Sequence, residues 1–392
     1  MKSNRWLLPE GIEEVLPQQA RWLEGMRRRL LDLFAAWGYE LVMPPFIEYL
    51  ESLLIGTGHD LDLQTFKLTD QLSGRMLGIR ADMTPQVARI DAHHLKRDVP
   101  TRLCYLGTVL HTRPDGFAGS RCLLQVGAEL YGDASCESDV EILRLLLETM
   151  EAAGIEEPCL DLGHVGIYRG LLQQAGLDAE QEAELFDVLQ RKAKAELVEK
   201  LAAWSLDNKI SSMLTALVDL HGGEEVLETA RTSLQDAAAG VHSSLENISR
   251  IAKLIKQHVP QINLHFDLAE LRGYNYHTGV VFAVYVSGRG QAIAQGGRYD
   301  GIGQAFGHAR PATGFSTDLH TLAALTSQDL NRRQGIFAPA DDDPDLLALI
   351  ARLRDEGECV ITQLPEQQGG AVEMGCDRQL VKTSGGWKVK QV

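Results

Sequence analysis

The sequence predicts an α+β fold built on a mainly antiparallel sheet, and three observations support this fold class. Strand-like runs are interleaved with helical stretches, without the regular strand–helix–strand alternation that is typical of a parallel sheet. Two pairs of runs are spaced as hairpins, Phe66–Leu68 with Leu77–Arg80 and Arg102–Leu110 with Arg121–Tyr131. The sequence contains neither a P-loop nor a Gly-x-Gly-x-x-Gly turn.

Length and composition indicate a globular protein of more than one domain. The chain has 392 residues, enough for two or three domains at roughly 100–200 residues each. Its net charge of −16 argues against extended nucleic-acid contact, which requires a basic surface. No apolar run approaches the ~20 residues of a membrane span, and Met1–Glu10 lacks the apolar core of a signal peptide. The six cysteines include no Cys-x-x-Cys pair, so we expect reduced thiols in a cytoplasmic protein and no metal site.

Apolar spacing predicts a first helix over Pro17–Trp37, with Gly38 just after its C-terminal end. A strand over Tyr39–Ile47 follows, and Pro44-Pro45 interrupts it. Because proline cannot donate a ladder hydrogen bond, we expect this pair at a sheet edge or at a dimer seam.

Two further helix starts are predicted from capping residues. Thr84 is expected to cap a helix that has Pro85 in its first position. Ser138 and Glu141 match the pattern of a capping box for a helix over Asp139–Ala153.

The pattern from residue 168 to residue 258 is helical throughout, so we expect an inserted subdomain of four or five helices. Strand-like runs then resume over Ile262–Asp267, Val280–Ser287 and Gln291–Gln295. Gly296-Gly297 is predicted to be a turn, and Gly314–Ser316 is predicted to open the last helix of the main domain.

The last 58 residues, 335–392, are predicted to be separate because a linker rich in proline and aspartate precedes a helix over Asp345–Glu356 and two or three short strands. We therefore expect three parts. The main domain is formed by residues 1–167 and 259–328, the helical insertion by residues 168–258, and a small C-terminal α/β domain by residues 335–392.

Three stretches carry a resemblance to a known family. They are Arg80-Ala-Asp-Met-Thr-Pro85, the hairpin Tyr105–Gly132, and Leu271–Gly279 followed by Gly296–Gly301. In order and spacing they resemble the histidyl-tRNA synthetases, over about residues 5–325. The resemblance implies the class II aminoacyl-tRNA synthetase fold, an antiparallel sheet flanked by helices, and a homodimer formed through Pro44-Pro45.

The resemblance also implies a histidine-binding cup. It places Asp82 and Thr84 at the ligand ammonium, with two residues of the hairpin beside them. A family tyrosine is replaced by His277. Two carboxylates fit an ammonium and an imidazole N–H, while tyrosine and glutamine fit the other ring nitrogen. The complete predicted set is Asp82, Thr84, Arg113, Gln125, Glu129, Arg272, Tyr276, His277 and Tyr299.

Structural interpretations of the same residues remain open. Asp82 and Glu129 could form a hydrogen-bonded pair without a ligand, and Gln125 could be a packing residue. Tyr299 could belong to turn scaffolding in which Arg298 and Asp300 are paired.

The ATP half of the family site is not matched. His111 stands where the family has an arginine for the α-phosphate. Arg113 could take the place of that arginine if the register is shifted by two residues. Thr321 and His320 stand where the family has an arginine that contacts ATP and its glutamate partner. Threonine has neither the charge nor the reach of arginine. The acidic tail, with ten acidic and six basic side chains, is also shorter and more negative than a tRNA-binding domain.

A chain that keeps the amino-acid cup but lacks ATP and tRNA binding resembles the synthetase-like regulatory subunits of ATP phosphoribosyltransferase, which act in the first step of histidine biosynthesis. This resemblance implies a protein that is not itself an enzyme and that needs no cofactor. Its expected partners are L-histidine, a short-form catalytic subunit, and a second copy of itself within a larger hetero-oligomer. Two alternatives stay open: an active histidine–tRNA ligase with a truncated C-terminus, and a histidine-sensing module for another partner.

Overall fold

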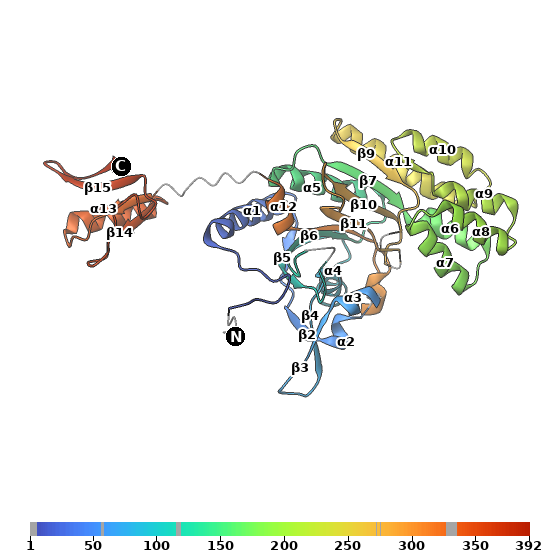
Figure 1. Cartoon of the computed structure of the whole chain (residues 1–392), viewed down its shortest axis with the longest axis horizontal. Helices are drawn as coiled ribbons and strands as arrows, with labels where there is room; N and C mark the ends of the chain where they lie inside the picture. Colours follow the sequence, from blue (N-terminus) through green and yellow to red (C-terminus); the bar gives the residue numbers. More distant parts are fainter. Residues whose placement is uncertain (1–5, 56–58, 115–118, 272, 275, 327–334) are drawn as a thin grey trace. The chain divides into compact units, whose positions relative to one another are not determined.

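The computed structural model describes the whole chain except residues 1–5, 56–58, 115–118, 272, 275 and 327–334 (Figure 1). Two compact units follow one another along the chain, residues 1–327 and residues 328–392. No described helix is long and apolar enough to cross a membrane. The six cysteines are free thiols.

A nine-stranded sheet organises the first unit. Among its described strands, only β1–β5 and β7–β9 pair in parallel, so the prediction of an α+β fold with a mainly antiparallel sheet is confirmed. In spatial order the strands are β1 (Glu40–Leu41), β5 (Thr101–Leu110), β6 (Cys122–Tyr131), β12 (Ala312–Asp318), β11 (Ala294–Arg298), β10 (Val280–Tyr285), β7 (Cys159–His164), β9 (Asn263–Asp267) and β8 (His221–Gly222).

Helices α1 (Pro17–Ala36), α5 (Cys136–Ala153) and α12 (Leu319–Leu325) pack together against this sheet. The apolar spacing that predicted the first helix corresponds to its buried face, and Phe34 meets Phe315 of β12 edge-on at 6.2 Å between ring centroids. Helix α1 ends at the predicted point, because Gly38 adopts a φ of 80° that only glycine takes up readily.

A smaller antiparallel sheet follows the proline pair. It consists of β2 (Ile47–Tyr49), β4 (Met76–Ile79) and β3 (Phe66–Thr69), which confirms the first predicted hairpin. The short elements beside it are α2 (Leu50–Leu53), α3 (His59–Gln64), α4 (Thr84–Arg89), the π-helical turn Ile90–Leu95 and the 3₁₀ turn Ile302–Phe306.

Six helices among the described residues lie between β7 and β9, more than the four or five that were predicted. They gather beside these strands in Figure 1, and α11 packs on α5 and α6. The two-residue strand β8 interrupts the predicted all-helical pattern because it adds to the sheet edge at β9. The helices are α6 (Val165–Ala175), α7 (Ala179–Gln190), α8 (Lys194–Ala203), α9 (Asn208–Leu217), α10 (Glu225–Ser233) and α11 (Ala239–His258).

The second unit has its own core. Helix α13 (Pro344–Asp355) buries Leu346 and Ile350 against the sheet, and Asp343 caps its first turn. There are four described strands rather than two or three, in the order β14 (Cys359–Thr362), β13 (Gly335–Ala338), β15 (Arg378–Thr383) and β16 (Gly386–Gln391).

Both predicted helix caps were wrong, because tertiary partners take the capping side chains. Thr84 lies inside α4, and its hydroxyl contacts the Tyr105 hydroxyl at 3.1 Å. Helix α5 begins three residues before the predicted start, at Cys136. There Ser138 bonds the preceding loop, and Glu141 forms an ion pair with Arg102 at 2.6 Å.

The glycines that were predicted to form a turn or to open a helix lie in strands instead. Gly296 and Gly297 are in β11, while Gly314 is in β12 and faces Gly297. A Cβ atom on Gly296 would lie 2.1 Å from the carbonyl oxygen of Gly314. These positions are therefore glycine because two strands approach closely, not because the chain reverses direction.

Candidate ligand-binding cavity

A cavity of about 790 Å³ opens over the middle of the nine-stranded sheet. Strands β6, β10, β11 and β12 contribute to its lining, together with the turn that precedes β10, the start of α4 and one face of α7. Six of the nine predicted site residues line it, brought together from distant parts of the sequence: Asp82, Thr84, Glu129, Tyr276, His277 and Tyr299.

Glu129, on β6, is the most buried charged group of this cavity, with 1% of its surface exposed. Tyr105 donates a hydrogen bond to one carboxylate oxygen at 3.1 Å, and Tyr299 donates to the other. Burial raises the pKa of the Glu129 carboxyl to about 8, and the nearby charge of Asp82 adds to the effect.

Glycines on the neighbouring strands leave room for this network. A Cβ atom on Gly314 would lie 1.6 Å from a carboxylate oxygen of Glu129, and one on Gly127 would lie 2.5 Å from the Tyr105 hydroxyl. Because these strands form a rigid sheet, a larger residue at either position would displace Glu129 or Tyr105.

Asp82 lies at the cavity wall and is held by a residue that does not line it. Gln125 donates to Asp82 at 2.8 Å and accepts a hydrogen bond from the backbone N–H of Met83 at 3.0 Å. The backbone N–H of Thr84 also donates to Asp82, at 3.1 Å. Gln125 therefore orients the carboxylate from behind, while Asp82 itself reaches the cavity.

Tyr276 and His277 enter the cavity from the turn before β10. The Tyr276 ring stacks on the Tyr299 ring, with centroids 4.9 Å apart. The Tyr276 hydroxyl is buried without a hydrogen-bond partner among the described residues. Because an unsatisfied buried hydroxyl is costly, this group is suited to meet a polar atom of a ligand.

Close packing fixes the ring of His277. A Cβ atom on Gly273 would lie 2.4 Å from His277 Nδ1, and one on Gly297 would lie 2.7 Å from Cδ2. Gly273 has a φ of 63°, a further reason for glycine at this turn. The histidine that replaces the family tyrosine therefore fits between two glycines.

The described lining of the cavity is acidic. It includes four carboxylates and no lysine or arginine; the carboxylates belong to Asp82, Glu129, Asp161 and Glu270. Phosphate groups are normally held by arginine, lysine or a metal ion. Among the described residues, no group of three or more histidine, cysteine, aspartate or glutamate side chains is arranged to hold a metal ion. This lining suits a ligand with an ammonium or an imidazole better than a triphosphate.

Two family models match this chain. One, described as "Histidyl-tRNA synthetase", covers residues 11–322, and the other, described as "ATP phosphoribosyltransferase subunit HisZ C-terminal domain", covers residues 333–390. The ATP phosphoribosyltransferase regulatory subunit of Thioalkalivibrio sulfidiphilus is 61% identical and aligned over 97% of each chain. The chain belongs to the family of ATP phosphoribosyltransferase regulatory subunits. The protein of the same description from Alkalilimnicola ehrlichii is 56% identical, over 98% of this chain and 96% of its own.

A solved structure confirms the predicted class II synthetase-like fold for this regulatory-subunit family member. The structure, described as an ATP phosphoribosyltransferase regulatory subunit/histidyl-tRNA synthetase from Bacillus halodurans C, superposes with a TM-score of 0.84 at 27% identity. It covers 94% of this chain and 96% of its own. The resemblance to histidyl-tRNA synthetases, predicted over about residues 5–325, is confirmed by the family model that matches residues 11–322.

The two predicted arginines have different outcomes in this family member. Arg113 is exposed and is not part of the lining. Arg272 lies outside the described residues, although its chain neighbours Leu271 and Gly273 both line the cavity.

His111 and Thr321, the two positions at which the resemblance predicted a missing ATP-contacting arginine, each form a hydrogen bond within the chain. The Nε2 atom of His111 lies 2.9 Å from the backbone oxygen of Ala81. Thr321 donates its hydroxyl to Asp318 at 2.9 Å, within the first turn of α12. Neither residue lines the cavity.

Sequence reasoning missed two residues of α7 that line the cavity and one, Tyr105, that supports Glu129 from behind. Tyr105 had no assigned role, although it faces Gly127 across the β5–β6 hairpin, and a tyrosine opposite a glycine indicates space for its ring. Phe186 and Gln190 reach the cavity from α7 of the insertion. Helical spacing places them on a helix, but it carries no signal that this helix lies beside the sheet.

Proposed function

We propose that this chain is the non-catalytic regulatory subunit of an ATP phosphoribosyltransferase. It binds L-histidine in the cavity, and histidine occupancy controls a short-form catalytic subunit in the first step of histidine biosynthesis. The observation that carries this proposal is an acidic, tyrosine-lined cavity in a chain of the regulatory-subunit family.

Histidine matches the polar groups that the cavity presents. Asp82 and Glu129 supply carboxylates for the ammonium and for an imidazole N–H, and the Tyr276 hydroxyl can serve the second ring nitrogen. Arg272 remains the candidate for the ligand carboxylate, because a guanidinium binds a carboxylate through two parallel hydrogen bonds.

Titration calorimetry tests the ligand. We expect heat on adding L-histidine and none on adding ATP with Mg²⁺. Glu129→Gln should weaken histidine binding by roughly 2–5 kcal/mol, the range for losing one partner of a buried charge pair. Unchanged affinity in this variant would reject the cavity as the histidine site.

The absence of catalysis is supported by the uses of two side chains. Since His111 bonds a backbone oxygen and Thr321 bonds Asp318, neither replaces a phosphate-binding arginine. Histidine-dependent pyrophosphate exchange should therefore be undetectable. Measurable exchange would favour the alternative, an active histidine–tRNA ligase. The acidic charge of the C-terminal unit also supports the proposal that this chain does not bind tRNA. A filter-binding assay would test this.

Control of a catalytic partner follows from linkage. A ligand that binds one assembly state more tightly shifts the equilibrium between states, and a coupling of about 1–3 kcal/mol is typical. Mixing the chain with a short-form catalytic subunit should raise phosphoribosyl transfer, and histidine should reverse the gain. A mixture no more active than the catalytic subunit alone would contradict this role. Co-purification of a different partner would instead support a histidine-sensing module.

A homodimer is proposed through the segment around the proline pair. Met43 is 74% exposed and Phe46 is 40% exposed, and Leu41 and Ile47 are similarly open. Four large apolar side chains exposed so close together indicate an interaction surface. Arg80 connects this segment to β5, since it donates to the backbone oxygens of Pro44 at 2.7 Å and Thr108 at 2.8 Å. Met43→Glu should shift sedimentation toward the monomer.

The free thiols fit a cytoplasmic location for the assembly.

A further inference from the structure

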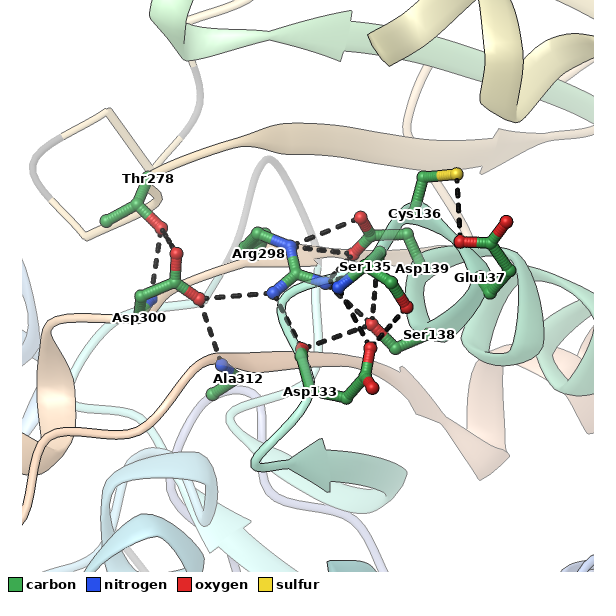
Figure 2. Close-up of polar contacts among 10 residues, drawn as sticks. All are labelled: Asp133, Ser135, Cys136, Glu137, Ser138, Asp139, Thr278, Arg298, Asp300 and Ala312. Atoms are coloured by element: carbon green, nitrogen blue, oxygen red, sulfur yellow. Dashed lines mark hydrogen bonds and ion pairs between the residues drawn. The ribbon is translucent and has the colours of Figure 1, made fainter. Parts of the chain in front are cut away.

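Arg298, the last residue of β11, is buried beside the cavity, with 9% of its side chain exposed. All five of its N–H groups have acceptors. Nε donates to Asp139 at 3.1 Å, Nη2 to Ser138 at 2.7 Å and to the backbone oxygen of Ser135, and Nη1 to the backbone oxygen of Asp133 and to Asp300. Figure 2 shows these partners converging on the guanidinium from the start of α5 and the end of β11.

Asp300 extends this network to the turn that carries the cavity residues. Thr278 donates its hydroxyl to Asp300 at 3.1 Å and accepts from the Asp300 N–H at 3.0 Å (Figure 2). The backbone N–H of Thr278 donates to the backbone oxygen of Arg298 at 2.7 Å. Asp300 also accepts from the backbone N–H of Ala312, at the start of β12. The end of the turn is thereby fastened to two strands.

The network thus connects the two sides of the cavity wall. Tyr299 follows Arg298 in the chain and holds Glu129, whereas Tyr276 and His277 immediately precede Thr278. The Tyr276 ring stacks on the Tyr299 ring, so a shift of either residue changes the site. The bonds of Thr278, this stacking and the packing of the His277 ring over Gly297 together hold the turn against β11.

We propose that Arg298 is a positioning residue for ligand binding: through Asp300 and Thr278 it holds the Tyr276–His277 turn against Tyr299 before the ligand arrives. This inference rests on the proposed histidine site. A pre-ordered cup binds more tightly, because apparent affinity falls with the fraction of molecules that are in the binding-competent conformation. Lysine cannot replace Arg298, because its ammonium has three donors. It cannot reach all the acceptors that surround the planar guanidinium.

The chain offers a matched control in Arg310. Like Arg298 it is 9% exposed and pairs with an aspartate that is 2% exposed, Asp91, at 3.0 Å. Its acceptors lie in the π-helical turn, at Val99 just before β5, and at the ends of β5 and β6; none of these lies in the turn before β10. Arg298→Lys and Arg310→Lys therefore each disrupt an equally buried ion pair. Only Arg298→Lys disrupts the hydrogen bonds that connect to the turn before β10.

The test is calorimetric titration of L-histidine into the full chain, with thermal unfolding measured in parallel. Arg298→Lys and Arg310→Lys should lower the melting temperature to a similar degree. Only Arg298→Lys should also weaken histidine binding, by about ten-fold, which corresponds to about 1.4 kcal/mol. Equal affinities in the two variants would overturn the positioning role.

A milder variant keeps the inference testable if Arg298→Lys does not fold. Thr278→Val removes only the hydroxyl that bonds Asp300 and should weaken histidine binding by about three-fold, with little change in melting temperature. Unchanged histidine affinity in Thr278→Val would contradict a role for the Thr278–Asp300 hydrogen bond in holding the turn. If the unaltered chain binds no histidine, the proposed function fails first, so the two failures are distinguishable.

Discussion

Glu129 shows how one buried residue makes the stability of the chain depend on pH. Its carboxyl is enclosed by Tyr105 and Tyr299, and burial raises its pKa from 4.5 to about 8. Without a bound ligand, the folded chain therefore favours the protonated form. A pKa that is raised by folding contributes stability that is complete below about pH 4.5, and this stability is lost as the pH rises through about 8.

The first prediction follows from this loss of stability with rising pH. Gln cannot ionise, so Glu129→Gln should gain stability relative to the unaltered chain between pH 5 and pH 9, by roughly 2–4 kcal/mol. Urea unfolding without ligand at both pH values measures the difference. Glu199→Gln, on the exposed face of α8, is the control and should show no such trend. A constant difference between Glu129→Gln and the unaltered chain would contradict the burial of a carboxyl that resists ionisation.

A second prediction at the residue scale uses the Tyr276 hydroxyl, which has no hydrogen-bond partner among the described residues. Tyr276→Phe removes no hydrogen bond to a described residue, so the free energy of unfolding should stay the same or rise slightly. Histidine binding should weaken by about 0.5–1.5 kcal/mol, the value of one hydrogen bond. Tyr299→Phe is the contrasting variant, since it leaves Glu129 with one donor fewer and should lower stability as well. Full-strength histidine binding by Tyr276→Phe would show that the hydroxyl does not meet the ligand.

At the scale of elements, the glycines of helices and strands have opposite roles. Gly25 is exposed on α1, and a Cβ atom there would meet nothing within 4 Å. Gly314 lies on β12, where a Cβ atom would overlap Glu129 and approach the backbone oxygen of Ala128 at 2.7 Å. Alanine in place of Gly25 therefore makes a helix position less flexible, whereas alanine in place of Gly314 overpacks the sheet.

The third prediction compares these two changes. Gly25→Ala should stabilise the chain by about 0.5–1 kcal/mol, because alanine loses less backbone entropy in a helix. Gly314→Ala should destabilise it by about 1–3 kcal/mol or more, because the strands have to separate. Chemical denaturation of both variants measures the two effects. A neutral Gly314→Ala would mean that the contact between β12 and Glu129 is looser than the structure indicates.

At the scale of the whole molecule, the described cavity lining and the C-terminal unit belong to different parts of the chain. Every described cavity residue belongs to the first unit, and the second unit has its own core around Ile336, Leu346 and Val360. The family model for the C-terminal domain begins at residue 333 and ends at residue 390, so it covers the second unit alone.

The fourth prediction is a truncation after residue 326. The shortened chain should bind L-histidine with unchanged affinity, within about two-fold, because no described part of the cavity is removed. Calorimetry on the truncated and full-length chains makes this comparison. A large loss of affinity would show that the second unit supports the site.

Much of the site was predictable because the motifs keep their polar residues in short runs. Asp82 and Thr84 lie at the start of one helix, Glu129 lies on a hairpin strand, and Tyr276 and His277 precede another strand. Helix caps were less predictable. Ser138 and Glu141 match a local capping pattern, yet Arg298 and Arg102, both far away in the sequence, bind them instead.

The sequence by itself determined the fold class, the family and the types of residue in the cup, because strand and helix periodicity and motif order are local properties of the chain. Only the tertiary structure decided how these residues are used. It brought α7 to the cavity, put Gln125 behind Asp82, enclosed Glu129 between two tyrosines, and joined Arg298 to the turn before β10. The physical reason is that burial and hydrogen-bond partners depend on contacts between distant segments, which no local pattern records.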